Sequence, residues 1–229
     1  MTQSLLTRDK GLQLIQKQSG NTVSTTNAER RRRGEESILR AAEEVFANRG
    51  FQGATMTEIG KRAGLPKANI HYYFSSKAKL YQRVIDDVFN VWLKAADQFE
   101  DHDDPRKSLT AYISAKMELS RSRPNGSKVW ANEIIHGAPM IREYLETHLR
   151  QWCASREARI QSWIDRRLMR PVNPRYLLYM IWASTQHFAD FSTQITVLND
   201  GEPLSDEAFE EAKQTLIDIF LSGLLYERD

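Results

Sequence analysis

Apolar side chains recur every three or four positions along most of the chain, and they nowhere alternate with the two-residue period of a half-buried strand. The first helical run follows a long polar stretch, and Gly50 is expected to end that helix. Its inward positions are Ile38, Ala41, Ala42, Val45 and Phe46. Hairpin signals between apolar runs and internal repeats are both absent from the sequence. The pattern predicts an all-α protein of about nine helices.

Capping residues place the boundaries of several later helices. Thr55 and Glu58 have the spacing of a capping box, in which each side chain bonds a free backbone N–H near the other residue. Gly64 is expected to end this short helix, a third helix to run over residues 67–73, and a long fourth one over about 77–100. Further helices begin after similar signals at Asp104-Pro105, Asn173-Pro174 and Ser205.

The pattern changes near residue 30 and divides the chain into three parts. Residues 1–29 are rich in Ser, Thr, Gln and Asn and are expected to form a flexible leader. Residues 30–82 are expected to form a three-helix head, because two short helices follow each other across a Gly-containing turn, as in a helix-turn-helix unit. Residues 83–229 then form a C-terminal helical bundle, which we expect to bind ligand and to dimerise.

Composition excludes several classes of protein. The 229 residues are 41% hydrophobic, yet no run approaches the roughly 18 to 20 apolar residues that a membrane-spanning helix needs. The first 20 residues lack the basic end, apolar run and cleavage site of a secretory signal, and the single cysteine, Cys153, allows no internal disulfide. We therefore predict a cytoplasmic protein that does not bind a membrane.

Charge is distributed unevenly, although the net charge is only +2. Residues 30–82 contain 11 Lys and Arg against 5 Asp and Glu, whereas residues 83–229 contain 18 against 23. A basic head on an acidic body is expected when only one end of the molecule meets a polyanion such as DNA. A chance imbalance between two solvated surfaces would give the same charges. The charge distribution therefore indicates DNA binding only together with the helix-turn-helix motif of the head.

The second helix of a helix-turn-helix unit enters the major groove of DNA. Here Ile70 and Phe74, four residues apart, are expected to pack inward against Ile59 and Phe46. The predicted groove contacts are Lys67, Asn69, His71 and Tyr72, and the predicted phosphate contacts are Tyr73 and Lys77. The DNA-contacting set is completed by Thr55 and Thr57 of the preceding helix. In the alternative, the aromatic residues are core and the polar ones solvated, as in helical bundles that never bind nucleic acid.

Four successive arginines, Arg30, Arg31, Arg32 and Arg33, come directly before the first helix of the head. Such a run can lie along phosphates or insert into a narrow minor groove as an N-terminal arm. A solvated tail would have the same composition. The position of the run beside the helix-turn-helix unit favours contact with DNA.

The body contains two groups of residues suited to a small planar ligand. On a helix, Trp182, Gln186 and Asp190 share one face, and an indole, an amide and a carboxylate can together bind a ring that bears N–H and C=O groups. Trp130 and Glu133 form a second such group, and we expect the two helices to face each other across a pocket. Alternatively, the tryptophans are core and the polar side chains satisfy buried groups or a dimer contact.

The last helices are expected to form a two-fold symmetric dimer interface, because they carry more apolar surface than one small body can bury. The residues concerned are Leu177, Met180, Ile181, Ser184, Phe188, Phe191, Leu216, Ile219, Phe220 and Leu224. A well-packed monomer is the alternative.

Motifs of enzymes and of metal sites are missing. The five histidines are scattered, without an HExxH pair, and no phosphate-binding glycine loop or G-x-S-x-G elbow occurs. Cys153, between Trp152 and Ala154, is expected to be packed. We predict no catalytic residue, no metal ligand and no cofactor. A helical adaptor that binds only protein remains a second class, although it has no need for a basic head.

The segment from Ile38 to Leu80 resembles the DNA-binding head of the TetR family of repressors. The matching residues are Ala41-Ala42, Phe46, Gly50-Phe51, Thr55-Met56-Thr57-Glu58-Ile59, Ala63-Gly64-Leu65, His71-Tyr72-Tyr73-Phe74, Lys77 and Leu80. The resemblance implies a homodimer whose two heads meet successive major grooves of a near-palindromic operator. It also implies that a ligand in the body changes the separation of the heads, so that the protein is a ligand-responsive transcriptional regulator, with repression expected and activation left open.

The body resembles the RutR-type pyrimidine-utilisation repressors, a branch of that family. The matching residues are 181–191 (IWASTQHFADF), Glu133-Ile134, Gly137-Ala138-Pro139 and Asn173-Pro174. This similarity implies an effector such as uracil or thymine. The long leader and the four arginines depart from that branch, which leaves a TetR-like regulator of another class of small molecule as the alternative.

Overall fold

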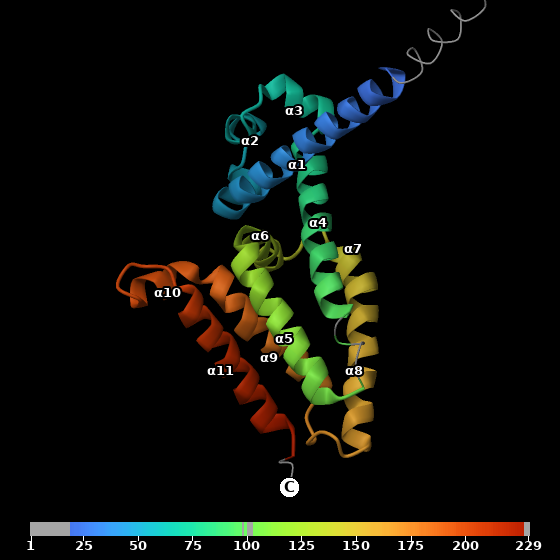
Figure 1. The fold of residues 1–229 in the computed structure, drawn as a ribbon, viewed down its shortest axis with the longest axis vertical. Coiled ribbons are helices and arrows are strands. Elements are labelled where there is room, and N and C mark those ends of the chain that lie inside the picture. The colour runs from blue at the N-terminus through green and yellow to red at the C-terminus, as the bar shows by residue number, and fades with distance from the viewer. Residues whose placement is uncertain (1–18, 98, 100–102, 227–229) are drawn as a thin grey trace, which may run out of the picture.

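The computed structural model describes residues 19–97, 99 and 103–226, and within these it describes no side chain for residues 19–25, 67 and 96. All regular elements of this part of the chain are helices (Figure 1). They are α1 (Ser19–Gly53), α2 (Met56–Ala63), α3 (Lys67–Tyr73), α4 (Lys77–Asp97), α5 (Pro105–Ser122), α6 (Pro124–Ile135), α7 (Arg142–Tyr144), the π-helical η1 (Leu145–Leu149), α8 (Arg150–Asp165), α9 (Pro174–Asp190), α10 (Ser192–Leu198) and α11 (Asp206–Leu224).

The all-α prediction is confirmed. The two short helices α7 and α10 and the π-helical segment bring the number of elements above the nine or so expected. None of the helices in the described ranges combines the length and apolar character that crossing a bilayer requires.

The predicted caps are present. Thr55 Oγ1 accepts a hydrogen bond from the Glu58 N–H at 3.1 Å, but the Glu58 carboxylate lies 3.6 Å from Arg49, so only one half of the capping box is formed. The hydroxyl of Ser76 accepts from the N–H of Lys79 at 3.2 Å at the start of α4. Three later helices, α5, α9 and α11, are capped by the side chains of Asp104, Asn173 and Ser205. Each side chain accepts a hydrogen bond from a backbone N–H two or three residues further along the chain.

Two glycines shape the head. Gly50 has φ 64° and ψ 176°, so the regular part of α1 ends there and the chain turns toward α2. Gly64 has φ 68°, and its N–H bonds the carbonyls of Gly60 and Lys61 at the end of α2. These left-handed conformations suit glycine because they bring no Cβ against the following carbonyl. The turn at Gly64 sets the angle between α2 and α3.

Helix α1 extends further toward the N-terminus than the sequence predicts. It begins at Ser19, so residues 19–29, which fall in the predicted leader, are helical, while residues 1–18 lie outside the described part. Residues 26–33 are exposed. Burial therefore contributes little to holding this stretch; Ala28, Glu29 and the arginines that follow are strong helix formers.

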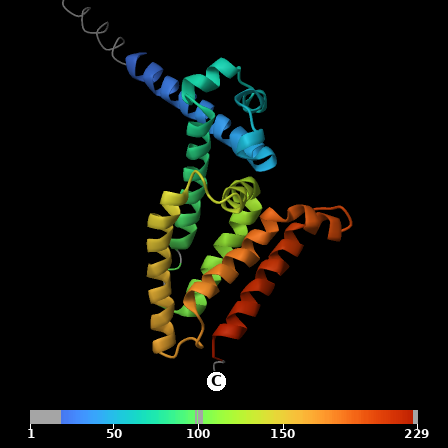
Figure 2. The same cartoon turned by 180° about the vertical axis from the view of Figure 1, so that it is seen from behind.

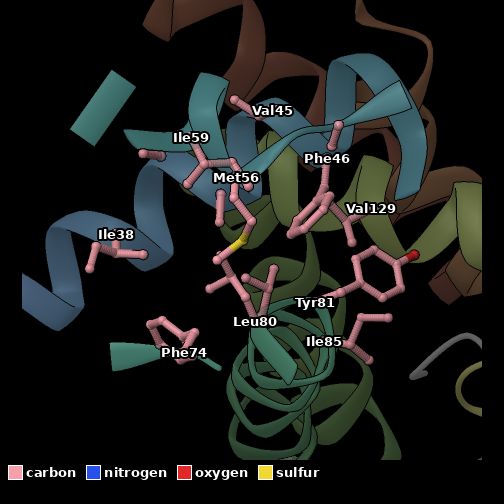
Figure 3. Close-up of a cluster of buried hydrophobic side chains, with 14 of the residues drawn as sticks. Ile38, Val45, Phe46, Met56, Ile59, Phe74, Leu80, Tyr81, Ile85 and Val129 are labelled. Atoms are coloured by element: carbon pink, nitrogen blue, oxygen red, sulfur yellow. The ribbon is translucent and has the colours of Figure 1, made fainter. Parts of the chain in front are cut away.

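Helix α4 joins the head to the body. Figures 1 and 2 show α1, α2 and α3 above, with α4 descending into the bundle of α5, α6, α8, α9 and α11. One core cluster, drawn in part in Figure 3, contains the inward residues of the head, including Phe46, Ile59, Ile70 and Phe74. That cluster also contains Val129 and Trp130 of α6, so the core of the head is closed by a helix of the body.

We expect Gly64→Ala to destabilise the head. An alanine at φ 68° is strained by about 1–2 kcal/mol, although nothing lies within 4 Å of the added Cβ. The matched control is Gly53→Ala at the end of α1, whose backbone is outside the left-handed region and whose Cβ would meet only Arg49 Cβ at 3.4 Å. Urea unfolding should show the loss for Gly64→Ala alone, and equal midpoints for the two variants would contradict this account of the turn.

Candidate DNA interface and ligand cavity

Helix α3 is anchored by one face and exposed on the other. Ile70 is fully buried and Phe74 is 8% exposed, both in the core cluster that contains Ile59 and Phe46 (Figure 3). The opposite face carries Asn69, His71 and Tyr72, all exposed, and Tyr72 keeps 73% of its surface. The backbone of Lys67 begins α3, but its side chain lies outside the described part. The exposed face thus presents a short polar ridge to solvent, while the buried face fixes its position.

Tyr73 and Lys77 are placed differently from the prediction. The Lys77 ammonium donates hydrogen bonds to the carbonyls of Phe51 at 2.7 Å and Ala54 at 2.9 Å, and it lies 4.6 Å from the ring centroid of Phe51. The ammonium therefore bonds the free carbonyl groups at the end of α1. For this reason we do not propose Lys77 as a phosphate contact. Tyr73 is half-buried against the head core, with its hydroxyl over Gly34 of α1, where a Cβ would collide with it. Local spacing could not reveal either contact, since each joins residues more than 20 positions apart.

The two threonines of α2 are both exposed. Thr55 uses its hydroxyl as the cap of α2, and Thr57 lies in the first turn of that helix. They stay predicted DNA contacts, with Thr55 also having a structural role.

The four arginines are exposed, as expected, but they are part of α1 and not of an extended arm. Successive residues of a helix point about 100° apart, so the four side chains cannot all face one groove. Arg32 lies 3.7 Å from Glu36, whereas the Arg31 guanidinium lies 6.0 Å from the ring centroid of Tyr72. Arg31 is therefore the arginine that shares a face with α3.

A cavity of about 70 Å³ lies in the upper body, between α4, α5, α6, η1, α8 and α9. This volume exceeds the roughly 10–15 Å³ that one water requires and is far below the roughly 300–1,000 Å³ of pockets for drug-sized ligands. Its walls are mainly aromatic and include four of the five tryptophans: Phe89, Trp92, Leu93, Tyr112, Lys116, Trp130, Leu149, Trp152, Trp182 and Gln186. The cavity suits a ligand of one flat ring.

Three of the five predicted ligand-binding residues line this cavity. Trp130 of α6 and both Trp182 and Gln186 of α9 contribute to it, so the two helices do face each other across a pocket. The Trp182 indole N–H donates to the Tyr112 hydroxyl at 2.8 Å, which fixes the ring. Gln186 is half-buried at the same wall.

Glu133 does not line the cavity. It is 4% exposed, its Oε2 accepts from the Tyr81 hydroxyl at 2.8 Å, and its Oε1 accepts from the Met140 N–H at 2.6 Å. Residues Gly137 and Ala138, at φ 88° and 56°, turn the chain back so that Met140 can reach it. Burial and the adjacent Glu133 raise the pKa of the Tyr81 hydroxyl. The carboxylate has a structural partner on each side, so we withdraw it as a ligand contact.

Asp190 also lies outside the cavity wall, one helical turn beyond Gln186. Its burial raises the pKa of the carboxyl group. We therefore do not assign it a direct contact with a ligand in this cavity.

Lys116 is the charged residue in this lining, and it was not predicted from the sequence to be a ligand contact. It is 5% exposed, and its ammonium lies 4.2 Å from the ring centroid of Trp92. Burial lowers the pKa of Lys116 to about 8, with the charge of Asp190 acting in the opposite direction. A signal was present in the sequence, because Lys116 falls in the apolar stripe of α5 that continues with helical spacing through Leu109, Tyr112, Ile113 and Met117.

Helix α6 connects the cavity with the head. Its Trp130 forms part of the cavity wall, while Glu133 bonds Tyr81 of α4. The side chain of Asn132 donates to the carbonyl of Ala47 in α1 at 3.3 Å. At the other end of α6, the Arg123 guanidinium forms ion pairs with Glu43 of α1 and Asp87 of α4. Movement of α6 would therefore displace both helices that carry the head.

Two family models match the chain. Residues 38–84 match bacterial regulatory proteins of the TetR family, and residues 85–227 match the C-terminal region of YcdC-like proteins. The boundary between the models falls within α4, close to the boundary predicted at residue 82.

Curated relatives are transcriptional regulators. The HTH-type transcriptional regulator RutR of Escherichia coli K12 is 36% identical over 173 residues, which cover 76% of this chain and 81% of RutR. An uncharacterised HTH-type regulator of Bacillus subtilis, YfiR, is 24% identical over 82% of the chain and 87% of its own length.

Solved structures share the fold. The ketosteroid regulator KstR2 of Mycobacterium tuberculosis aligns with a TM-score of 0.69 at 20% identity, covering 86% of this chain and 96% of KstR2. AibR, in a complex with isovaleryl coenzyme A and operator DNA, aligns with a TM-score of 0.67 at 15% identity, over 81% of this chain and 97% of AibR. With both family models and the identity to RutR, the chain belongs to the TetR family and is a DNA-binding transcriptional regulator, not an enzyme.

Proposed function

We propose that the protein acts in the cytoplasm as a homodimeric repressor. Helix α3 of each subunit binds one half of a near-palindromic operator, and a small planar effector of the pyrimidine class, such as uracil or thymine, binds in the cavity and releases the DNA. One observation carries this proposal: a single helix, α6, supplies both a wall of the cavity through Trp130 and a buried bond to the head through Glu133.

The proposed DNA interface consists of the exposed face of α3 and the neighbouring face of α1. Asn69 can pair with adenine and His71 with guanine or phosphate, while Arg31 beside Tyr72 supplies positive charge for the backbone. The position of α3 is set by its buried residues, so the interface is rigid before DNA arrives. The paired heads of a dimer then meet half-sites one helical turn, about 34–36 Å, apart.

We expect the double variant Asn69→Ala/His71→Ala to lose selectivity for the operator. A good side-chain contact to a base edge contributes roughly 1–3 kcal/mol, so the two subunits together should lose at least a hundredfold in affinity for operator over random DNA. The operator can be recovered as DNA fragments bound by the purified protein, and affinity is then measured by mobility shift across a salt series.

The control is Asn48→Ala, an exposed asparagine beside the α1–α6 contact. It should leave the affinity unchanged. If wild-type binding did not weaken steeply with salt, or if the double variant kept full selectivity, the assignment of α3 to DNA would be wrong.

The proposed dimer interface lies on α9 and α11. Met180 is 61% exposed with Tyr176 one turn before it, and Ile219 of α11 is also 61% exposed. The two helices are held together by the Phe188 and Phe209 rings, 5.9 Å apart. Three residues that the sequence analysis placed in this interface belong instead to the core of the protomer, namely Leu177, Ile181 and Leu224.

We expect Met180→Asp to convert the dimer to a monomer at micromolar concentration. An unpaired carboxylate buried in an apolar interface costs several kcal/mol, and the symmetry applies that cost twice. Ile135→Asp, at a residue 76% exposed at the end of α6, is the matched control and should remain dimeric. Sedimentation velocity measures both. A monomeric wild type, or a dimeric Met180→Asp variant, would contradict the proposed interface.

We expect Tyr81→Phe to uncouple the effector from DNA. A hydrogen bond to a charged group contributes about 1.5–3 kcal/mol, so losing the Tyr81–Glu133 bond should raise the uracil or thymine concentration needed for release by about tenfold or more. Calorimetry should show the effector still bound. Tyr226→Phe, at an exposed tyrosine far from α6, is the control. If the effector releases both variants from DNA at the same concentration, the Tyr81–Glu133 bond does not carry the coupling. If no pyrimidine binds the protein, the effector is not a pyrimidine.

A further inference from the structure

The cavity holds a buried positive charge without a counter-charge in contact. Among the described residues, Lys116 forms no ion pair within 4.0 Å, and the acidic group that acts on it, Asp190, does so only at longer range. With 5% of its surface exposed, the side chain does not extend to bulk solvent. A charged ammonium in an apolar environment is unfavourable by several kcal/mol unless it is paired.

One other hydrogen-bond donor of the cavity wall is also without an acceptor. The Trp152 indole N–H is buried and has no acceptor among the described residues. Glu133 and Asp190, the two acidic side chains predicted to bind ligand, are absent from the wall. The lining therefore offers flat aromatic faces and N–H donors, and no carboxylate.

We propose that the natural effector is a small planar ring that carries an acidic group, and that Lys116 binds the anionic oxygen of that group. This inference rests on the proposed function and narrows its ligand class from neutral pyrimidines to ring carboxylates. The tryptophan faces would enclose the ring, and Gln186 would read its remaining N–H or C=O groups. Lys116 was not among the residues expected from the sequence to bind ligand.

A carboxylate fits better than a neutral carbonyl for an electrostatic reason. A carbonyl would give Lys116 one hydrogen bond and leave its charge uncompensated, whereas a carboxylate gives both the bond and the counter-charge. The lowered pKa of Lys116 shows how weakly the ligand-free cavity supports the charge. Binding of an anion would stabilise the ammonium form.

A groove beside the cavity carries positive charge. This groove shares Leu149 and Trp182 with the cavity and is lined also by Arg150 and Arg175. Arg175 is paired with Glu157 at 2.7 Å, and Arg150 is exposed. Positive charge beside the cavity favours the approach of an anion.

A purely structural role for Lys116 predicts something different. If its contact with Trp92 served mainly to hold the fold, replacing it would lower stability. A ligand-binding lysine that is strained in the empty cavity predicts the reverse, because methionine has a similar length and carries no charge to bury.

The test compares Lys116→Met with Lys107→Met, the same substitution at an exposed position of the same helix. Calorimetry of the full chain uses uracil, uracil-6-carboxylate and benzoate at pH 7. We expect the wild type and Lys107→Met to bind uracil-6-carboxylate at least tenfold more tightly than uracil. Lys116→Met should lose that preference and show a higher Tm without ligand.

The outcomes separate this inference from the proposed function. Two results would contradict the acidic effector and leave the proposed pyrimidine regulator intact. In the first, the wild type binds uracil as tightly as uracil-6-carboxylate. In the second, Lys116→Met keeps the preference for the carboxylate or has a lower Tm than the wild type. If benzoate binds through Lys116 and neither pyrimidine binds, the role of Lys116 in binding an anion is supported and the pyrimidine effector is wrong. If none of the three compounds binds, both are wrong.

Discussion

The buried carboxylate of Glu133 is the constraint on which the arrangement of head and body depends. A carboxylate that is only 4% exposed destabilises the fold unless it accepts hydrogen bonds. Here the donors are the Tyr81 hydroxyl and the Met140 N–H. One partner belongs to α4 and the other to the turn after α6. The three segments therefore cannot shift independently without leaving a charge unpaired. Since Trp130 lies one turn away on α6, the cavity wall is part of the same unit.

Local signals predicted the helices well, because a cap or a stop involves residues only a few positions apart. Thr55, Asp104, Asn173 and Ser205 all accept the backbone bonds expected of them, and Gly64 has the left-handed conformation of a helix end. The inward residues of the head also followed from periodicity, since Ile70 and Phe74 are buried in the same cluster as Phe46 and Ile59. These elements needed no knowledge of the tertiary structure.

Sequence spacing did not reveal the structural partners of polar side chains where those partners are distant along the chain. Lys77 bonds carbonyls at the end of α1, and Glu133 bonds Tyr81, 52 positions away. No spacing rule gives those pairings, because they arise only when helices pack. Lys116 is the opposite case: its place in the apolar stripe of α5 was visible, and a charge at a core position is unusual enough to indicate function.

Coupling requires that an effector bind one conformation more tightly than another. Under the proposed function the cavity would meet this condition, because its walls belong to two groups of helices. Trp92 of α4 and Trp130 of α6 belong to helices that contact α1 of the head, whereas Lys116 of α5 and Trp182 of α9 belong to the rest of the body, where α9 carries exposed apolar residues. A ring held at one end by Lys116 and stacked at the other on Trp130 would therefore sense the distance between the groups. A preference of only about 1–3 kcal/mol for one distance changes operator affinity by about 5- to 150-fold.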